Sequence, residues 1–424
     1  MPENALGPPG GACVYALAVA DRYLVYAPFG GVLAQVNAAA ARALSEGLRD
    51  GGRRAVADPR VAELSRRLGD ADAQAPARRG AAAPVCLLLT SGAIADGDAP
   101  GRVVESAPRP APDPAAVIHA LDCAQAACRR SGSARYEVIV DVDGADERWL
   151  DVAVHRARLA AARQGIGASF VGVTHGGVRP QRWRFLGDHC EALLLRLDRD
   201  AAHGAPVDGG PLVDGRVERL REVAALRGSS ARLCVWSRLS AWAPAEVVAL
   251  ARSVVAALGP CAVALAPPDG DDGGAAAPAM APDAVVTGAL QAWRALREGG
   301  CEPASAAAIR DGPPLWSAPG SRGEILLGPD GDVPPRLGSL ADWAARCSGC
   351  FCWATCDCGG LVSDPGGAGG YRAGCVFQRT LTACALLERL GAGAPVQSWL
   401  DSPAARSWLA AAPSDRLTEL GGTA

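Results

Sequence analysis

Short apolar runs alternate with segments of helical spacing through the middle of the chain. The runs lie at residues 85–90, 136–142, 168–174, 192–198, 232–237 and 261–266. Segments with apolar residues three or four apart separate them, most clearly at 113–131, 148–164, 217–226 and 245–258. Strands connected through helices pair in parallel. The pattern therefore predicts an α/β region with six parallel strands, either an open (β/α)6 barrel or a doubly wound sheet.

A hairpin followed by helices is predicted for residues 1–80. Its strands are the apolar runs 14–19 and 23–26, which are joined by charged residues. An apolar-periodic stretch follows a Gly-Gly pair, so we expect one helix over 32–48. A stretch rich in Arg, Ala and Asp at 49–83 predicts a further helix. These elements form a small α+β module.

The chain changes character again after the last predicted strand. Residues 267–283 are rich in Gly, Pro, Asp and Ala and predict a linker. We expect a helix at 285–297 and an amphipathic helix at 375–390. Between these two helices lies a region with little periodicity and many cysteines, which predicts a separate C-terminal module.

Composition excludes several classes of protein. A chain of 424 residues is long enough for two or three domains. Its net charge of −3 provides no basic surface for nucleic acid. No apolar run approaches the ~18 residues of a membrane span, and the first residues do not resemble a signal peptide. The sequence therefore predicts a cytoplasmic protein whose cysteines are not a disulfide framework.

Seven of the fifteen cysteines fall between Cys347 and Cys384. Cys347, Cys350 and Cys356 follow the pattern Cys-x2-Cys-x5-Cys, and Cys375 lies further along the chain. Cysteines at this spacing are typical of metal ligands. Four thiolates can bind either a [4Fe-4S] cluster or a tetrahedral zinc ion. We therefore predict one metal centre at Cys347, Cys350, Cys356 and Cys375, with iron and zinc both open.

This cysteine pattern resembles the SPASM domain of radical S-adenosylmethionine (SAM) peptide maturases, which carries two auxiliary iron–sulfur clusters. The resemblance implies that the four cysteines hold the second cluster, and it favours iron. Ligand positions of the first cluster are occupied by Ser317, Arg336 and Gly360. With only Cys301 as a remaining candidate, that cluster is expected to be absent. Cys352 and Cys358 lie off the pattern, and Cys358 is an alternative ligand.

The first predicted strand, Val85-Cys86-Leu87-Leu88-Leu89-Thr90, resembles the first barrel strand of the radical SAM family. In that family a Cys-x-x-x-Cys-x-x-Cys segment follows and binds the [4Fe-4S] cluster that cleaves SAM. The ligand positions here are Ala93, Gly97 and Pro100, none of which can bind iron. The resemblance implies a partial (β/α)6 barrel in which SAM binding and cleavage are lost.

Weaker traces of the family follow along the predicted barrel. His175 and Arg238 come after the third and fifth strands, where the family has a turn Asn and an Arg that contacts SAM. We expect His175 to be a turn residue and not a catalytic base. The chain contains no other recognised catalytic motif. A cluster rebuilt from Cys86 with Cys123 or Cys128 is the alternative that would retain SAM chemistry.

The resemblance implies three domains: an N-terminal module at 1–80, a degenerate barrel at 81–283 and a SPASM-like domain at 284–424. The first resembles the module with which maturases bind a leader peptide as an extra strand. We therefore expect a non-catalytic protein that binds a precursor peptide or a partner maturase during maturation of peptide natural products. The alternatives are an active maturase with unusual cluster ligands and a structural subunit of an intact maturase.

Overall fold

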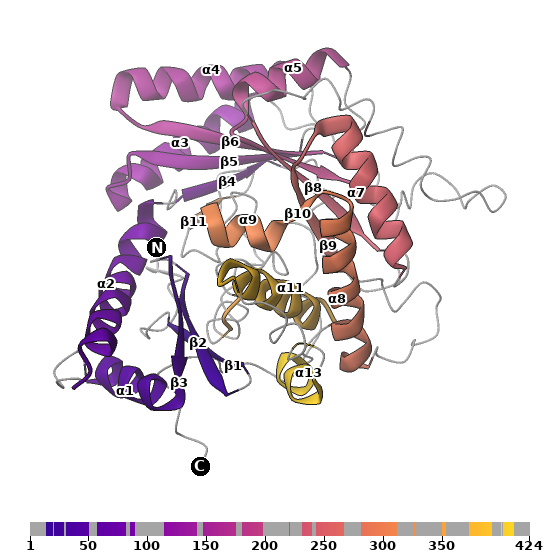
Figure 1. Ribbon diagram of the computed structural model, residues 1–424. Coiled ribbons are helices and arrows are strands. Elements are labelled where there is room, and N and C mark those ends of the chain that lie inside the picture. The colour runs from indigo at the N-terminus through magenta and orange to yellow at the C-terminus, as the bar shows by residue number, and fades with distance from the viewer. Residues whose placement is uncertain are drawn as a thin grey trace.

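The chain contains two β-sheets within the part that the structure describes. This computed structural model describes residues 14–19, 21–28, 31–50, 57–81, 85–89, 114–141, 147–174, 180–197, 220, 231–239, 243–266, 281–311, 325–327, 350–352, 373–391, 400 and 402–410. One sheet has three antiparallel strands and the other has eight parallel strands (Figure 1). The protein is therefore an α/β protein, as predicted.

All six predicted strands are present in the large sheet. They are β4 (Val85–Leu89), β5 (Arg135–Asp141), β6 (Gly167–Thr174), β7 (Ala192–Arg196), β8 (Arg232–Arg238) and β9 (Ala262–Ala266). Each pairs in parallel with the next, so their order in the sheet is their order in the chain. A doubly wound sheet reverses its strand order at a switch point. The sequential order excludes that arrangement for β4 to β9.

Two short strands extend the sheet at its edges. β10 (Glu302–Pro303) pairs with β9, and β11 (Ile325–Leu327) pairs with β4, both in parallel. Neither was predicted, because strands of two or three residues are too short to show a periodic pattern. They bring segments from the C-terminal third of the chain to both edges of the sheet.

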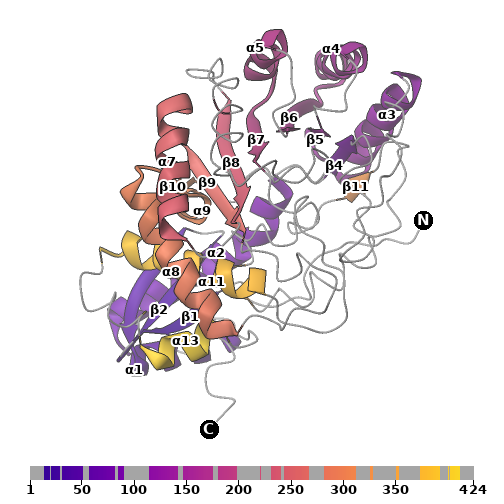
Figure 2. The same ribbon diagram turned by 90° about the vertical axis from the view of Figure 1, so that its right-hand side faces the viewer.

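Helices on one side of the sheet connect its strands. They are α3 (Pro114–Ser131), α4 (Glu147–Gln164), α5 (Pro180–His189) and α7 (Pro244–Leu258). Right-handed crossovers between neighbouring strands place their helices on the same face. Figure 2 shows these four helices in an arc that runs from α7 through α5 and α4 to α3 around the strands, with α11 (Ala373–Arg389) below them. α9 (Ala304–Asp311) packs against β9 and α11. Of the predicted helix at 217–226, only Leu220 lies within the described residues.

Alternate strand residues build two separate cores. The face under the connecting helices contributes residues such as Val138, Phe170, Leu193 and Val235 to the largest core. The opposite face forms a second cluster that includes Ile139, Val171, Val173, Leu194 and Trp236. Parallel strands that are buried on both faces read as continuous apolar runs instead of alternating ones. This is why β4 to β9 appear in the sequence as short continuous apolar runs.

The junction of α7 with α8 (Pro282–Glu298) requires a residue without a side chain. α8 confirms the predicted helix at 285–297. A Cβ atom added at Gly299 would lie 2.3 Å from the Cβ of Ala251 in α7, which is closer than real Cβ contacts allow. Because a Cβ cannot move without its backbone, only glycine lets the end of α8 lie against α7 and continue into β10.

The small N-terminal sheet has three strands instead of the predicted two. They are β1 (Tyr15–Val19), β2 (Arg22–Ala27) and β3 (Val32–Asn37). The prediction of a helix was wrong for residues 32–37, where two β-branched valines and antiparallel pairing with β2 outweigh the helical spacing. α1 (Ala38–Arg49) begins only after Asn37, whose side chain accepts a hydrogen bond from the Ala40 N–H at 2.8 Å.

Both faces of the small sheet are covered. One face joins a cluster with Leu44 of α1 and Leu68 of α2 (Pro59–Ala81). The other face, which includes Leu17 and Tyr26, belongs to the same core as α8 and α11. Figures 1 and 2 show β1 and β2 beside these C-terminal helices. The N-terminal module is therefore packed onto the C-terminal part of the chain.

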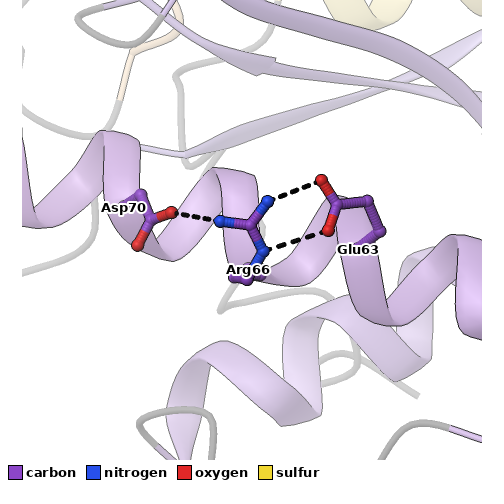
Figure 3. A network of polar contacts seen from close by, with 3 residues as sticks. All are labelled: Glu63, Arg66 and Asp70. Atoms are coloured by element: carbon purple, nitrogen blue, oxygen red, sulfur yellow. Dashed lines mark hydrogen bonds and ion pairs between the residues drawn. The ribbon is translucent and has the colours of Figure 1, made fainter.

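An ion-pair network lies on the surface of α2 (Figure 3). Arg66 donates from Nη2 and Nε to the two carboxylate oxygens of Glu63, at 2.7 and 3.0 Å. Its Nη1 donates to Asp70 at 3.0 Å. The hydrogen bonds from Arg66 lower the pKa of Glu63. Pairs three and four residues apart support a helix of 23 residues that has many polar positions.

The helix α11 is buried on all sides, although the sequence predicted an amphipathic helix. Every residue from Val376 to Leu387 is buried, and α11 packs against α8, α9 and α13 (Pro403–Ala410). A helix buried all round is usually apolar throughout. This one carries Gln378 and Arg379, whose polar groups therefore need partners inside the protein.

Candidate metal centre

Two of the four predicted ligands lie within the described residues. Cys375 is in the first turn of α11, and Cys350 begins the short segment 350–352. Both are partly buried. Cys347 and Cys356 lie outside the described residues, and so does Cys358.

Arg379 contacts Cys350 and lies on the same helix face as Cys375. It follows Cys375 by four residues on α11, and side chains at this spacing are neighbours on one helix face. The Nη1 group of Arg379 donates a hydrogen bond to the Sγ of Cys350, with a donor–sulfur distance of 3.8 Å. Cys350 therefore lies against the helix face that carries Cys375.

The surroundings of these two sulfur atoms suit thiolates. N–H groups in the first turn of a helix lack intrahelical acceptors and carry partial positive charge. Cys375 stands in that turn, and the guanidinium of Arg379 lies beside Cys350. Positive charge of this kind stabilises a cysteine that binds a metal as its thiolate. These two thiols thus fit as ligands of a metal whose other two predicted ligands lie outside the described residues.

Cys352 is held in a different way. Its side chain is fully buried, and its Sγ donates to the main-chain carbonyl of Gln378 over 3.9 Å. It also lies near Tyr26 of β2, and burial raises the pKa of that tyrosine. This position between α11 and the N-terminal sheet fits the interpretation of Cys352 as a packing residue.

Cys301, the remaining candidate ligand of the first auxiliary cluster, is a buried thiol. Its Sγ donates to the main-chain carbonyl of Ala251 at 3.4 Å, and burial raises its pKa to about 11. Burial raises the pKa of the neighbouring Cys261 to about 12. These buried side chains pack between helix and sheet. Ser317, Arg336 and Gly360 lie outside the described residues.

The cysteines of the alternative barrel cluster occupy dissimilar environments. Cys128 is a buried residue of α3, donates to the carbonyl of Arg135 at 3.5 Å, and has a pKa that burial raises to about 11. Cys123 is partly exposed and lies 3.7 Å from His119 Nε2. Because Cys128 is part of the core, the geometry does not favour it as a cluster ligand. Cys86 is in β4, in register with Glu137.

The positions expected to contact SAM lie mostly outside the described residues. The three cluster-ligand positions, Ala93, Gly97 and Pro100, and the turn residue His175 are outside them, whereas Arg238, at the position of the family's SAM-contacting Arg, is the last residue of β8. On the sheet face opposite the helices, the guanidinium carbon of Arg196 lies 5.0 Å from the centre of the Trp236 ring. Sequence reasoning found neither this pair nor Arg379. No local pattern marks such contacts, since Arg379 and Cys350 are 29 residues apart.

The fold and the cysteines define an α/β protein with a sequential parallel sheet, one thiol in the first turn of a buried helix and a second thiol that accepts a hydrogen bond from Arg379 of that helix. Across the described ranges, no three His, Cys, Asp or Glu side chains form a group that could hold a metal, and two of the four predicted ligands lie beyond these ranges. Nor does any helix in that part of the chain have the length and apolar character to cross a membrane. No protein-family model matches the chain, and no curated protein matches it.

Proposed function

We propose that this chain is a degenerate radical SAM/SPASM-like protein that binds a precursor peptide or a partner maturase and does not cleave SAM. The observation that carries the proposal is the placement of Cys350 against the face of α11 that bears Cys375. The sequential order of β4 to β9 supports it, because an open (β/α)6 barrel requires that order.

The metal centre in this proposal has a structural role. Cys350 and Cys375, together with Cys347 and Cys356, would hold a [4Fe-4S] cluster or a zinc ion. Bound metal supplies folding free energy where a chain segment buries little apolar surface. Residues 359–370 are rich in Gly, so the apolar surface available there is small. The protein's own residues provide the thiolates, the helix terminus and the guanidinium.

The edge strand β3 is our candidate for binding a peptide. β1 and β3 form the two edges of the N-terminal sheet. Four of the five residues of β1 are buried, whereas β3 has mostly partly or fully exposed residues. An accessible edge strand can add a further strand through main-chain hydrogen bonds. A precursor peptide would then extend the sheet beside β3.

The test is a SAM cleavage assay on protein purified without oxygen and reconstituted with iron and sulfide. Given dithionite and SAM, we expect no 5′-deoxyadenosine above a control without protein. Clear turnover would reject the proposal and favour an active maturase with unusual ligands. The third hypothesis, a structural subunit of an intact maturase, predicts a different result. The chain would then co-purify stably with an intact maturase and would show no affinity for a short peptide encoded by a neighbouring gene.

A further inference from the structure

Arg379 is a charged side chain in the interior of the protein, with an exposed fraction of 1%. Its guanidinium reaches two other segments of the chain. Nε donates to the carbonyl of Leu409 and Nη2 to the carbonyl of Trp408, both at 3.2 Å. Nη1 donates to Cys350 Sγ at 3.8 Å. One side chain thus joins α11 to α13 and to the segment that carries a predicted metal ligand.

Two aromatic rings also lie against the guanidinium. The guanidinium carbon lies 5.0 Å from the ring centre of Phe351 and 4.8 Å from that of Trp408. The two rings stack with their centres 5.4 Å apart and an angle of 18° between their planes. Ring faces attract cations. Because Phe351 directly follows Cys350, these contacts also hold Cys350 in place.

A buried cation is stable only where negative charge or dipoles compensate it. The carbonyls of Trp408 and Leu409 belong to the last turn of α13, where the helix dipole is negative. These carbonyls and the two rings contribute partial charges. A metal-bound thiolate at Cys350 would add further negative charge, and a hydrogen bond from a guanidinium to an anion is charge-assisted.

We infer that Arg379 is a positioning residue of the proposed metal centre. Its Nη1–H group orients the Cys350 thiolate toward Cys375, and its charge offsets part of the negative charge that four thiolates bring together. Residues that hydrogen-bond to metal ligands fix the orientation of those ligands, and their loss weakens metal binding about 10- to 100-fold. This role presupposes the metal centre of the proposed function.

The experiment measures Zn²⁺ affinity of the full-length chain by chelator competition, with Co²⁺ as an optical probe of thiolate coordination. Arg379→Met keeps much of the side-chain length and removes the charge and the donors. We expect about 10- to 100-fold weaker Zn²⁺ binding with an unchanged circular dichroism spectrum. Arg389→Met is the matched control, since Arg389 is on the same helix and donates to the carbonyl of Ile309. It should bind Zn²⁺ like the unmodified chain.

The outcomes separate this inference from the proposed function. If the unmodified chain binds Zn²⁺ and Arg379→Met binds it equally well, Arg379 serves only to join α11 and α13, and the inference is wrong. An unmodified chain that binds neither zinc nor iron overturns the metal centre and this role together. If Arg379→Met fails to fold, Arg379→Lys decides. Lysine keeps the positive charge, but its ammonium cannot hold two carbonyls and a sulfur in one fork. We therefore expect a loss of Zn²⁺ affinity that is smaller than the one given above for Arg379→Met. Unchanged affinity would overturn the inference.

Discussion

Gln378 in α11 donates a hydrogen bond from Nε2 to the main-chain carbonyl of Leu265 in β9, at 3.1 Å. The two residues are 113 positions apart and both are buried. This bond connects the helix that carries Cys375 to the parallel sheet. The segment that carries the candidate ligand Cys375 and the parallel sheet are therefore packed together. Substitutions in α11 should affect the stability of both.

Replacing Gln378 by Leu should destabilise the folded protein. The substitution leaves the buried carbonyl of Leu265 without this donor, and an unsatisfied buried polar group costs about 1–3 kcal/mol. Urea unfolding followed by circular dichroism measures the change. Gln164→Leu is the control, because the Gln164 side chain makes a hydrogen bond at the surface, with Arg129. It should change stability by less than about 0.5 kcal/mol. A Gln378→Leu protein as stable as this control would contradict the role of the bond.

Changing Cys347, Cys350, Cys356 or Cys375 to Ala should remove the metal and expose the C-terminal region to protease. A site of four cysteines loses most of its metal affinity when any one of the ligands is removed. The metal matters for stability because structural zinc supplies on the order of 10 kcal/mol of folding free energy. Metal analysis of the unmodified chain should find about four irons or one zinc, and not the iron content of several clusters. Limited proteolysis with mass spectrometry locates the cuts.

Cys352→Ala is the control for the four cysteine variants. Its thiol is buried beside Tyr26 and Gln378 and is not part of the predicted ligand set. We expect the metal to stay bound and the protease pattern to stay the same. Loss of metal in Cys352→Ala, or a metal-free protein with an ordered C-terminal region, would show that the ligands have been wrongly assigned.

Proline substitutions in β3 should block peptide binding if the peptide adds to this edge. Along an edge strand, alternate N–H groups point toward and away from the neighbouring strand. Ala34 and Gln35 are adjacent in β3, so the N–H of one of them points away from β2. Proline has no N–H, so one of the variants Ala34→Pro and Gln35→Pro removes that outward donor. That variant should fold and lose affinity for the precursor peptide, as measured by fluorescence polarisation. Full affinity in both folded variants, or after deletion of residues 1–50, would exclude β3 as the binding edge.

Stability should fall as the pH rises from 9 toward 12. Burial raises the pKa of Cys190 and of Cys261 from 9.0 to about 12 each. In this range the unfolded chain releases these protons while the folded chain keeps them. The unfolded state then binds fewer protons, so the free energy of unfolding decreases with pH. Urea unfolding at a series of pH values should show a shallower decrease for Cys190→Ala than for Cys123→Ala, which changes a partly exposed thiol. Equal slopes would contradict this assignment.

The sequence by itself determined the central α/β architecture. Strands β4 to β9 are continuous apolar runs because both of their faces are buried, and the helices between them repeat at helical spacing. These patterns are local, so they can be read from the sequence without knowledge of the fold. The sequence also marked Cys350 and Cys375 as a chemical pair through their place in a cysteine pattern.

Only the tertiary structure decided how these parts meet. Residues 32–37 have helical spacing, yet pairing with β2 makes them a strand. The order of the strands excluded the doubly wound alternative, and two short edge strands depend entirely on the neighbours that they pair with. The approach of Arg379 to Cys350 joins positions that no period along the chain connects. Contacts of this kind arise from the packing of α11 among other helices. The free energy that favours them comes from interactions between segments, so the sequence of one segment does not reveal them.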